Sequence, residues 1–165
     1  MITVPARAAG EENSLEYVQA KEYALRSLTC LEQSEFQIRQ KLSRKKYTEK
    51  TIDEVLLFLK QYDFVNDQRF TEQYVASHCQ RLNRRQILDK LYMKGIRQAE
   101  IDDYLELYQY DEEQILKQAV EKYMNSHDME KDGQYDKCII YFMQKGYAYA
   151  MIKSVLVQTA IVQEE

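Results

Sequence analysis

Residues 87–105, ILDKLYMKGIRQAEIDDYL, contain a spaced pattern that occurs three times in the chain. In every copy, apolar residues stand at the same offsets before and after a lysine-containing turn. The second residues of the copies, Leu42, Leu91 and Phe142, lie 49 and 51 residues apart, a spacing typical of repeat proteins. Four-residue steps between the apolar positions favour helices. The copies consist of Ile38, Leu42, Lys45, Lys46, Tyr47, Ile52 and Leu56; of Ile87, Leu91, Lys94, Gly95, Ile96, Ile101 and Leu105; and of Cys138, Phe142, Lys145, Gly146, Tyr147, Ile152 and Leu156.

The composition favours the same fold class. Hydrophobic residues make up 45% of the chain and charged residues 30%, and the 165 residues include only four Gly and one Pro. This balance suits amphipathic helices that bury one stripe and expose the other face. We therefore predict an all-α protein, a tandem array of three three-helix repeats that forms an elongated, curved solenoid-like molecule. The expected segments are a disordered N-terminal tail at 1–13 and repeats at 14–62, 63–109 and 110–162.

Helix-capping signals divide the repeats into their helices. Ser34 and Gln37 have the spacing of a capping box, and Asn83 with Gln86 offers a similar arrangement in the next copy. Thr48 can cap the helix that follows. One repeat is therefore expected to be helix, turn, helix, turn, helix. The first helix should carry an apolar stripe of Tyr17, Ala20, Ala24, Leu28 and Leu31.

The turn inside the pattern differs between the copies. Gly95 and Gly146 follow its lysine, at a place where a left-handed residue commonly ends a helix. Lys46 takes this place in the first copy. A non-glycine residue in the left-handed conformation costs roughly 1 kcal/mol. Either the first turn has another conformation, or Lys46 is kept for another reason, such as its charge.

Charge is sorted along the chain, although the net charge is only −4. Residues 37–50 and residues 81–97 each contain six basic side chains against one acidic side chain. Residues 98–136 contain twelve acidic side chains against three lysines. The sequence therefore predicts a basic first half and an acidic third repeat, with a basic surface despite the acidic pI.

The cysteines and the hydropathy indicate a reducing compartment. Cys30, Cys79 and Cys138 are odd in number and form no Cys-x-x-Cys pair, so neither a disulfide framework nor a zinc site is predicted, and buried thiols are expected. No apolar run approaches the roughly 18 residues that a membrane span needs, and residues 1–10 lack the apolar centre of a secretory signal. We expect a cytoplasmic protein.

Residue patterns that support catalysis or metal binding are missing. His78 and His127 belong to no metal-ligand spacing, and His78 points about 100° away from its neighbour Cys79 on a helix. The acidic loop 128–133 resembles the start of a calcium loop, but Ile139 stands where a bidentate Glu is needed. No glycine-rich phosphate loop occurs. We expect no catalytic residue, no metal site and no cofactor.

Tyrosine is the preferred aromatic residue, with fourteen Tyr and no Trp. Some of these rings could stack on unpaired bases beside Arg and Lys, as in single-strand binding proteins. They could equally fill helix interfaces while their hydroxyl groups reach water. We favour the second interpretation for most positions, with Tyr92, between Lys90 and Lys94, as the best exception. The positions concerned are Tyr47, Tyr62, Tyr74, Tyr92 and Tyr147.

Two stretches within residues 25–107 carry a family resemblance. The first stretch contains Ser34-Glu35, Lys41-Leu42, Ile52 and Val55-Leu56. The second contains Asp63-Phe64-Val65-Asn66-Asp67-Gln68-Arg69-Phe70, Tyr74-Val75, Ile87, Leu91, Lys94-Gly95-Ile96 and Ile101. In this order and spacing, the two stretches closely resemble the RecX family of bacterial regulators of the RecA recombinase, and the third repeat extends the resemblance more loosely.

The resemblance implies a non-enzymatic regulator. Such a protein binds in the groove of a RecA filament on single-stranded DNA and inhibits recombinase and coprotease activity in DNA repair and the SOS response. Within the second stretch, Asn66 or Asp67 should cap a helix, Phe70 and Tyr74 should be buried one turn apart, and Arg69 should stay outside. We expect a monomer whose RecA- and DNA-binding face comprises Arg39, Lys41, Arg44, Lys45, Lys46, Arg69, Arg81, Arg84, Arg85, Lys90 and Lys94.

Two other functions remain open. Arg84 and Arg85 could begin the recognition helix of a duplex-binding helix-turn-helix protein. A helical scaffold for another helix or peptide is the second alternative. Within the leading hypothesis, the first two repeats would face DNA and the filament, and the acidic third repeat would face protein alone.

Overall fold

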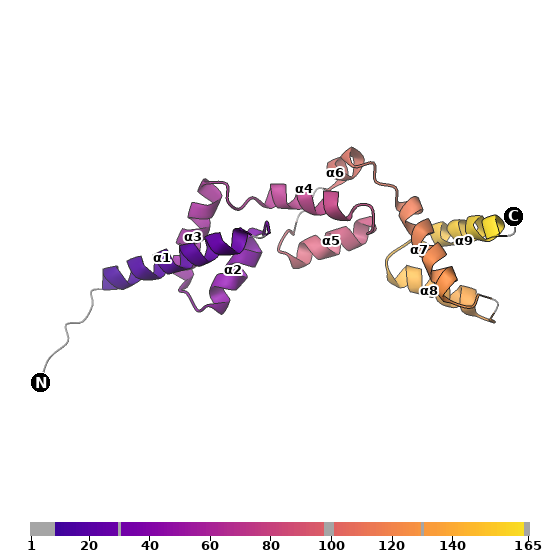
Figure 1. Cartoon of the computed structure of the whole chain (residues 1–165), viewed down its shortest axis with the longest axis horizontal. Coiled ribbons are helices and arrows are strands. Elements are labelled where there is room, and N and C mark those ends of the chain that lie inside the picture. The colour runs from indigo at the N-terminus through magenta and orange to yellow at the C-terminus, as the bar shows by residue number, and fades with distance from the viewer. Residues whose placement is uncertain (1–8, 30, 98–100, 130, 164–165) are drawn as a thin grey trace, which may run out of the picture. The chain divides into compact units, whose positions relative to one another are not determined.

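The structure, a computed structural model, describes residues 9–29, 31–97, 101–129 and 131–163 (Figure 1). Within these ranges the chain forms nine α-helices and no strand, which confirms the all-α prediction. The helices are α1 (Ala9–Leu28), α2 (Glu35–Arg44), α3 (Glu49–Gln61), α4 (Asp67–His78), α5 (Arg84–Met93), α6 (Asp102–Leu107), α7 (Glu112–Ser126), α8 (Gln134–Gln144) and α9 (Tyr149–Gln163). No helix in the described part of the chain is long and apolar enough to cross a membrane.

The described residues divide into two compact units. Unit 1 takes its residues from 1–71 and 92–98, and unit 2 from 72–91 and 99–165. Each unit contains one large apolar cluster.

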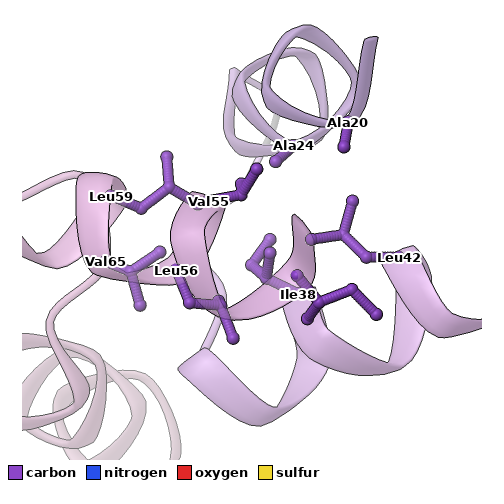
Figure 2. Close-up of a cluster of buried hydrophobic side chains, with 9 residues drawn as sticks. Ala20, Ala24, Ile38, Leu42, Val55, Leu56, Leu59 and Val65 are labelled. Atoms are coloured by element: carbon purple, nitrogen blue, oxygen red, sulfur yellow. The ribbon is translucent and has the colours of Figure 1, made fainter. Parts of the chain in front are cut away.

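The core of unit 1 lies between α1, α2 and α3, which pack against one another. Figure 2 shows the small side chains of Ala20 and Ala24 on α1 facing larger side chains of α2 and α3. Small residues on one helix let its backbone approach the larger residues of the others, which fills the interface without voids. The cluster comprises Ala20, Ala24, Ile38, Leu42, Ile52, Val55, Leu56, Leu59 and Val65.

The core of unit 2 lies where α7 and α8 pack against α9. Burial raises the pKa of Tyr147 to about 12, because the ionised phenolate would lose its hydration. Burial also raises the pKa of the Cys138 thiol, so Cys138 behaves as a small apolar residue. The cluster comprises Leu116, Val120, Met124, Cys138, Phe142, Tyr147, Ile152, Val155 and Leu156.

The predicted caps are present. The Ser34 hydroxyl accepts from the backbone N–H of Gln37, and the Gln37 side chain accepts from the backbone N–H of Ser34, which completes the capping box. Asn83 and Gln86 make the same reciprocal pair, at 2.7 and 3.2 Å. Thr48 caps α3 by accepting from the N–H of Thr51.

The turn after the second helix has the same left-handed conformation in all three copies of the pattern. The φ angles are 64° at Lys46, 90° at Gly95 and 97° at Gly146. The first turn is therefore not different, and Lys46 occupies a strained conformation despite its side chain.

Close packing explains why glycine occupies this turn in the later copies. A Cβ atom on Gly95 would lie 2.2 Å from Cβ of Phe36, and a Cβ on Gly146 would lie 2.8 Å from Cδ of Arg85. Beside each glycine, the preceding copy's cap residue donates to the lysine carbonyl of the turn. Ser34 Oγ donates to Lys94 O at 2.5 Å, and Asn83 Nδ2 donates to Lys145 O at 2.9 Å. Lys46, by contrast, is exposed.

Several expectations need correction. Helix α1 begins at Ala9, inside the stretch expected to be a tail, while residues 1–8 lie outside the described residues. Leu31 is 75% exposed instead of continuing the apolar stripe of α1, because that helix ends at Leu28. Cys79 and Cys138 are buried as expected, whereas Cys30 lies outside the described residues.

Candidate binding surface

Helix α2 carries the first group of predicted binding residues. Ile38 and Leu42 are fully buried and fix which face of the helix points into the core. Lys41 and Arg44 are three positions apart and therefore lie on the same side of the helix. Arg39 is two positions from Lys41, about 200° around the helix, so it lies on the other side of the buried stripe. The basic residues of α2 thus do not form a single face.

Arg39 is held by α3. Its guanidinium group pairs with the carboxylates of Glu49, at 3.1 Å, and Asp53. The hydrogen bond to Asp53 is the main reason that the pKa of Arg39 is raised. Because two carboxylates surround one guanidinium group, the charge of Arg39 is neutralised locally and its side chain joins α2 to α3.

Arg69 is similarly engaged within unit 1. Asn66 caps α4 by accepting from the backbone N–H groups of Gln68 and Arg69. The Arg69 guanidinium then pairs with Glu32 and Asp63, and the hydrogen bond to Glu32 is the main cause of its raised pKa. Arg69 was expected to stay outside, but these partners hold its half-buried side chain against the body of unit 1.

The two arginines at the start of α5 also have partners, both within unit 2. Arg84 donates to both carboxylate oxygens of Asp102, at 2.8 and 2.9 Å, which holds α5 to α6 and lowers the pKa of Asp102. Arg85 lies 3.8 Å from Asp89 one turn later, and its side chain covers Gly146. Both side chains therefore serve the packing of unit 2.

Two further predicted binding residues lie against aromatic rings. Lys45 lies over the ring of Tyr23, 5.3 Å from its centroid, and Lys94 lies 5.9 Å from the ring centroid of Phe70. Within the described residues no acidic side chain lies within ion-pair distance of the remaining five, which are Lys41, Arg44, Lys46, Arg81 and Lys90. A partner can therefore reach these five cations without breaking an existing ion pair.

The tyrosines divide between core and surface. Tyr147 is buried, and Tyr47 is partly buried against the core of unit 1. Tyr74 is half-buried and stacks on His78. Tyr62 and Tyr92 are 60% and 62% exposed, so their rings remain available for stacking. Tyr92, the exception named from the sequence, lies in α5 between Lys90 and Lys94, and its role in stacking stays a prediction.

An aromatic cluster between α7 and α8 was missed by sequence reasoning. The ring of Tyr123 lies 4.0 Å from that of His127 and 5.2 Å from that of Tyr141. One signal could have indicated it. The motif Tyr-x-x-Ser-His occurs at 74–78 and again at 123–127, and it contains both histidines of the chain. Among the residues with described side chains, no group of three or more His, Cys, Asp or Glu could hold a metal ion.

Comparison with protein families identifies both three-helix segments around this surface. Residues 20–59 match the first three-helix domain of RecX, and residues 66–105 match the second three-helix domain. These segments contain α2, α3 and α5 with their basic residues.

Individual relatives agree. The regulatory protein RecX of Clostridium tetani is 35% identical over 152 residues, which cover 90% of this chain and 69% of that protein. The regulatory protein RecX of Clostridium acetobutylicum is 32% identical over 146 residues, covering 85% of this chain and 68% of the relative.

Solved structures show the same fold. The crystal structure of RecX from Lactobacillus salivarius has a TM-score of 0.69 at 22% identity and covers 90% of this chain and 99% of its own. A second crystal structure of regulatory protein RecX has a TM-score of 0.74 at 18% identity, covering 94% of this chain and 80% of its own. With the sequence matches, these findings show that the chain belongs to the RecX family of regulatory proteins.

Proposed function

We propose that the chain binds a RecA filament assembled on single-stranded DNA and inhibits its recombinase and coprotease activity by occupying it. Family membership supports a regulatory role. The observation that carries the filament proposal is that five of the predicted binding residues have no acidic partner among the described residues. They are Lys41, Arg44 and Lys46 in unit 1 and Arg81 and Lys90 in unit 2.

These side chains suit a partner that carries repeated negative charge. Lysine and arginine that release counterions from phosphates give an affinity that falls as salt concentration rises. A filament on DNA presents phosphates and protein side by side, so such contacts can add to protein contacts elsewhere on the chain. Occupancy alone can then block the filament, and no chemical step by this chain is required.

The strain at Lys46 fits this proposal. Its left-handed turn would be easier to form with glycine, which the other two copies have. The lysine side chain is exposed and contributes nothing to the described core. A binding role for its charge explains why a residue that costs stability occupies this position.

The proposal is tested by neutralising the available cations while sparing the paired ones. The variant K41Q/R44Q/K46Q should bind RecA–DNA filaments more weakly, and its salt dependence should be shallower by about one unit of slope for each phosphate contact that is lost. The matched control is R39Q, which removes a cation of α2 that Glu49 and Asp53 already neutralise. It should leave the salt slope unchanged. Equal slopes for the triple variant and the wild type, measured by fluorescence anisotropy, would contradict the proposed surface.

The helix-turn-helix alternative gains no support from the geometry. It needs Arg84 and Arg85 at the start of α5 to reach base edges. Arg84 is held by both oxygens of Asp102, and Arg85 covers Gly146. Duplex readout by these residues would require both interactions to be given up.

A further inference from the structure

Unit 2 contains a cavity of about 460 Å³ between α7 and α8. Its lining combines the rings of Tyr123, Tyr141, Phe142 and His127 with the ammonium groups of Lys122 and Lys145. Its volume falls within the range of about 300–1,000 Å³ that is usual for small-molecule sites. The cavity lies in the acidic third part of the chain.

The rings are fixed in position yet partly accessible. His127 stacks on Tyr123 with a centroid distance of 4.0 Å and an interplanar angle of 10°. Tyr123 in turn contacts Tyr141 and Phe142, with centroid distances of 5.2 and 5.9 Å. His127 is exposed and Tyr141 is 40% exposed, so both present ring surface that a planar ligand can cover. A preordered aromatic surface loses little entropy when a ligand stacks on it.

The hydrogen bonds of His127 show which of its two ring nitrogens can accept a hydrogen bond from a ligand. Its Nδ1 lies 2.8 Å from the carbonyl oxygen of Tyr123 and 2.9 Å from the hydroxyl oxygen of Ser126, which donates its own hydrogen to the same carbonyl. A carbonyl oxygen can only accept, so Nδ1 carries the proton and donates. In the neutral ring, Nε2 is then an acceptor, which can receive a hydrogen bond from an N–H group of a ligand.

The two lysines supply the charge. Nζ of Lys145 lies 4.4 Å from the ring centroid of Tyr141, and Lys122 is exposed on α7. Ring faces beside ammonium groups are the combination that binds unpaired bases together with their phosphates. We propose that this cavity binds an unpaired nucleotide, with the base stacked on the exposed rings and the phosphate near Lys122 and Lys145.

This site goes beyond the proposed function and does not depend on RecA. The third part of the chain was expected to contact protein alone, because it is acidic. Stacking depends on ring surface more than on net charge, so an acidic surrounding weakens the phosphate contact but does not prevent base binding. The source of the nucleotide is single-stranded DNA or a free nucleotide, which share this chemistry.

The test uses the fact that the chain contains only two histidines. His127 lies in the cavity, whereas His78 makes the same stack with Tyr74, at 4.0 Å, but does not line it. The imidazole signals of the full chain are followed by NMR, with H78Q used for assignment. Thymidine 5′-monophosphate or the oligonucleotide (dT)₁₀ should shift the His127 signal and leave His78 unchanged. Inorganic phosphate should shift neither.

Each outcome decides the proposal. Shifts from both nucleotide probes indicate that the cavity accepts free nucleotides, and a shift from (dT)₁₀ alone indicates single-stranded DNA; either result supports it. If inorganic phosphate shifted the His127 signal as much as the nucleotides do, the cavity would bind anions and not bases. If no probe shifted the signal, the cavity would not bind nucleotides and could instead accommodate a protein segment. Both of these results overturn the proposal. None of the measurements contains RecA, so they can fail or succeed independently of filament binding.

Variants add a second readout. Y141A should weaken binding of the probe that shifts His127 by about 5- to 100-fold, the usual loss when one stacking ring is removed. K145Q should weaken binding while keeping the rings in place. The matched control is K153Q, because Lys153 lies 5.8 Å from the ring centroid of Tyr149 in α9 but outside the cavity. A loss of affinity in K153Q as large as that in K145Q would contradict a localised site.

Discussion

Gly95 and Gly133 share a left-handed backbone but differ in what surrounds the missing side chain. A Cβ on Gly95 would lie 2.2 Å from Cβ of Phe36, whereas nothing lies within 4 Å of a Cβ on Gly133. We expect Gly133→Ala to cost about 1–2 kcal/mol of unfolding free energy, from backbone strain alone. Gly95→Ala should cost about 2–4 kcal/mol, because overpacking adds to that strain.

Gly146→Ala provides an intermediate case. The atom in its way is Cδ of Arg85, at 2.8 Å, and a flexible side chain can move where the Cβ of Phe36 cannot. The three variants should therefore rank Gly95→Ala, Gly146→Ala and Gly133→Ala in falling order of lost stability. Urea denaturation followed by far-UV circular dichroism measures this order. Equal losses at all three glycines would mean that the turn conformation alone determines the cost.

At the scale of elements, a carboxylate on α1 accepts hydrogen bonds from the N-terminal residues of α3 and its cap. Oε1 of Glu16 accepts from the backbone N–H of Thr48 at 2.8 Å, and Oε2 accepts from the hydroxyl groups of Thr48 and Thr51 at 3.0 and 2.8 Å. A negative charge is favourable at a helix N-terminus, where backbone N–H groups lack partners inside the helix. The bond from the Thr48 N–H is the main reason that the pKa of Glu16 is lowered from its usual 4.5.

The lowered pKa of Glu16 predicts how stability depends on pH. A carboxyl group with a lower pKa in the folded state stabilises that state above its unfolded pKa, and this contribution is lost as the pH falls through the folded value. E16Q should therefore be less stable than the wild type at neutral pH by about 1 kcal/mol, the usual cost of a lost cap. The difference should shrink below about pH 4.5.

Glu22 pairs with Arg26 on the exposed side of α1, so E22Q is the control and should change the stability little. A difference that stays constant down to low pH would rule out the ionic cap.

Local patterns predicted the elements better than they predicted the contacts between them. The caps at Ser34 and Asn83 follow from spacings of three residues, and the pattern residues Ile38 and Leu42 are fully buried as expected. The bond from Ser34 Oγ to Lys94 O joins residues 60 positions apart, and no local spacing specifies it. The ion pair between Arg84 and Asp102 likewise depends on where α5 and α6 pack, so the sequence alone presented Arg84 as a free cation.

At the scale of the whole molecule, the count of basic residues overstates the charge that a partner meets. Arg39, Arg69 and Arg84 belong to the basic set expected from the sequence, but each is paired with a carboxylate inside its own unit. The net charge of −4, in contrast, understates the positive charge of the remaining chain, because acidic residues are concentrated in 98–136. The cations that matter for binding are those left over after internal pairing, and they occur in both units.

Cations in both units predict a preference for assembled RecA over free RecA. Once one unit has bound a filament, the other meets further binding sites at a high effective concentration, which a free RecA monomer does not offer. We expect the chain to bind RecA assembled on single-stranded DNA at least about 10-fold more tightly than free RecA.

Neutralising either set of cations, K41Q/R44Q/K46Q or R81Q/K90Q, should remove most of this preference, because the single remaining set no longer benefits from the linkage. K153Q should keep it. Anisotropy titrations with labelled chain measure both affinities, and equal affinity of the wild type for free and assembled RecA would show that the two units do not act together on a filament.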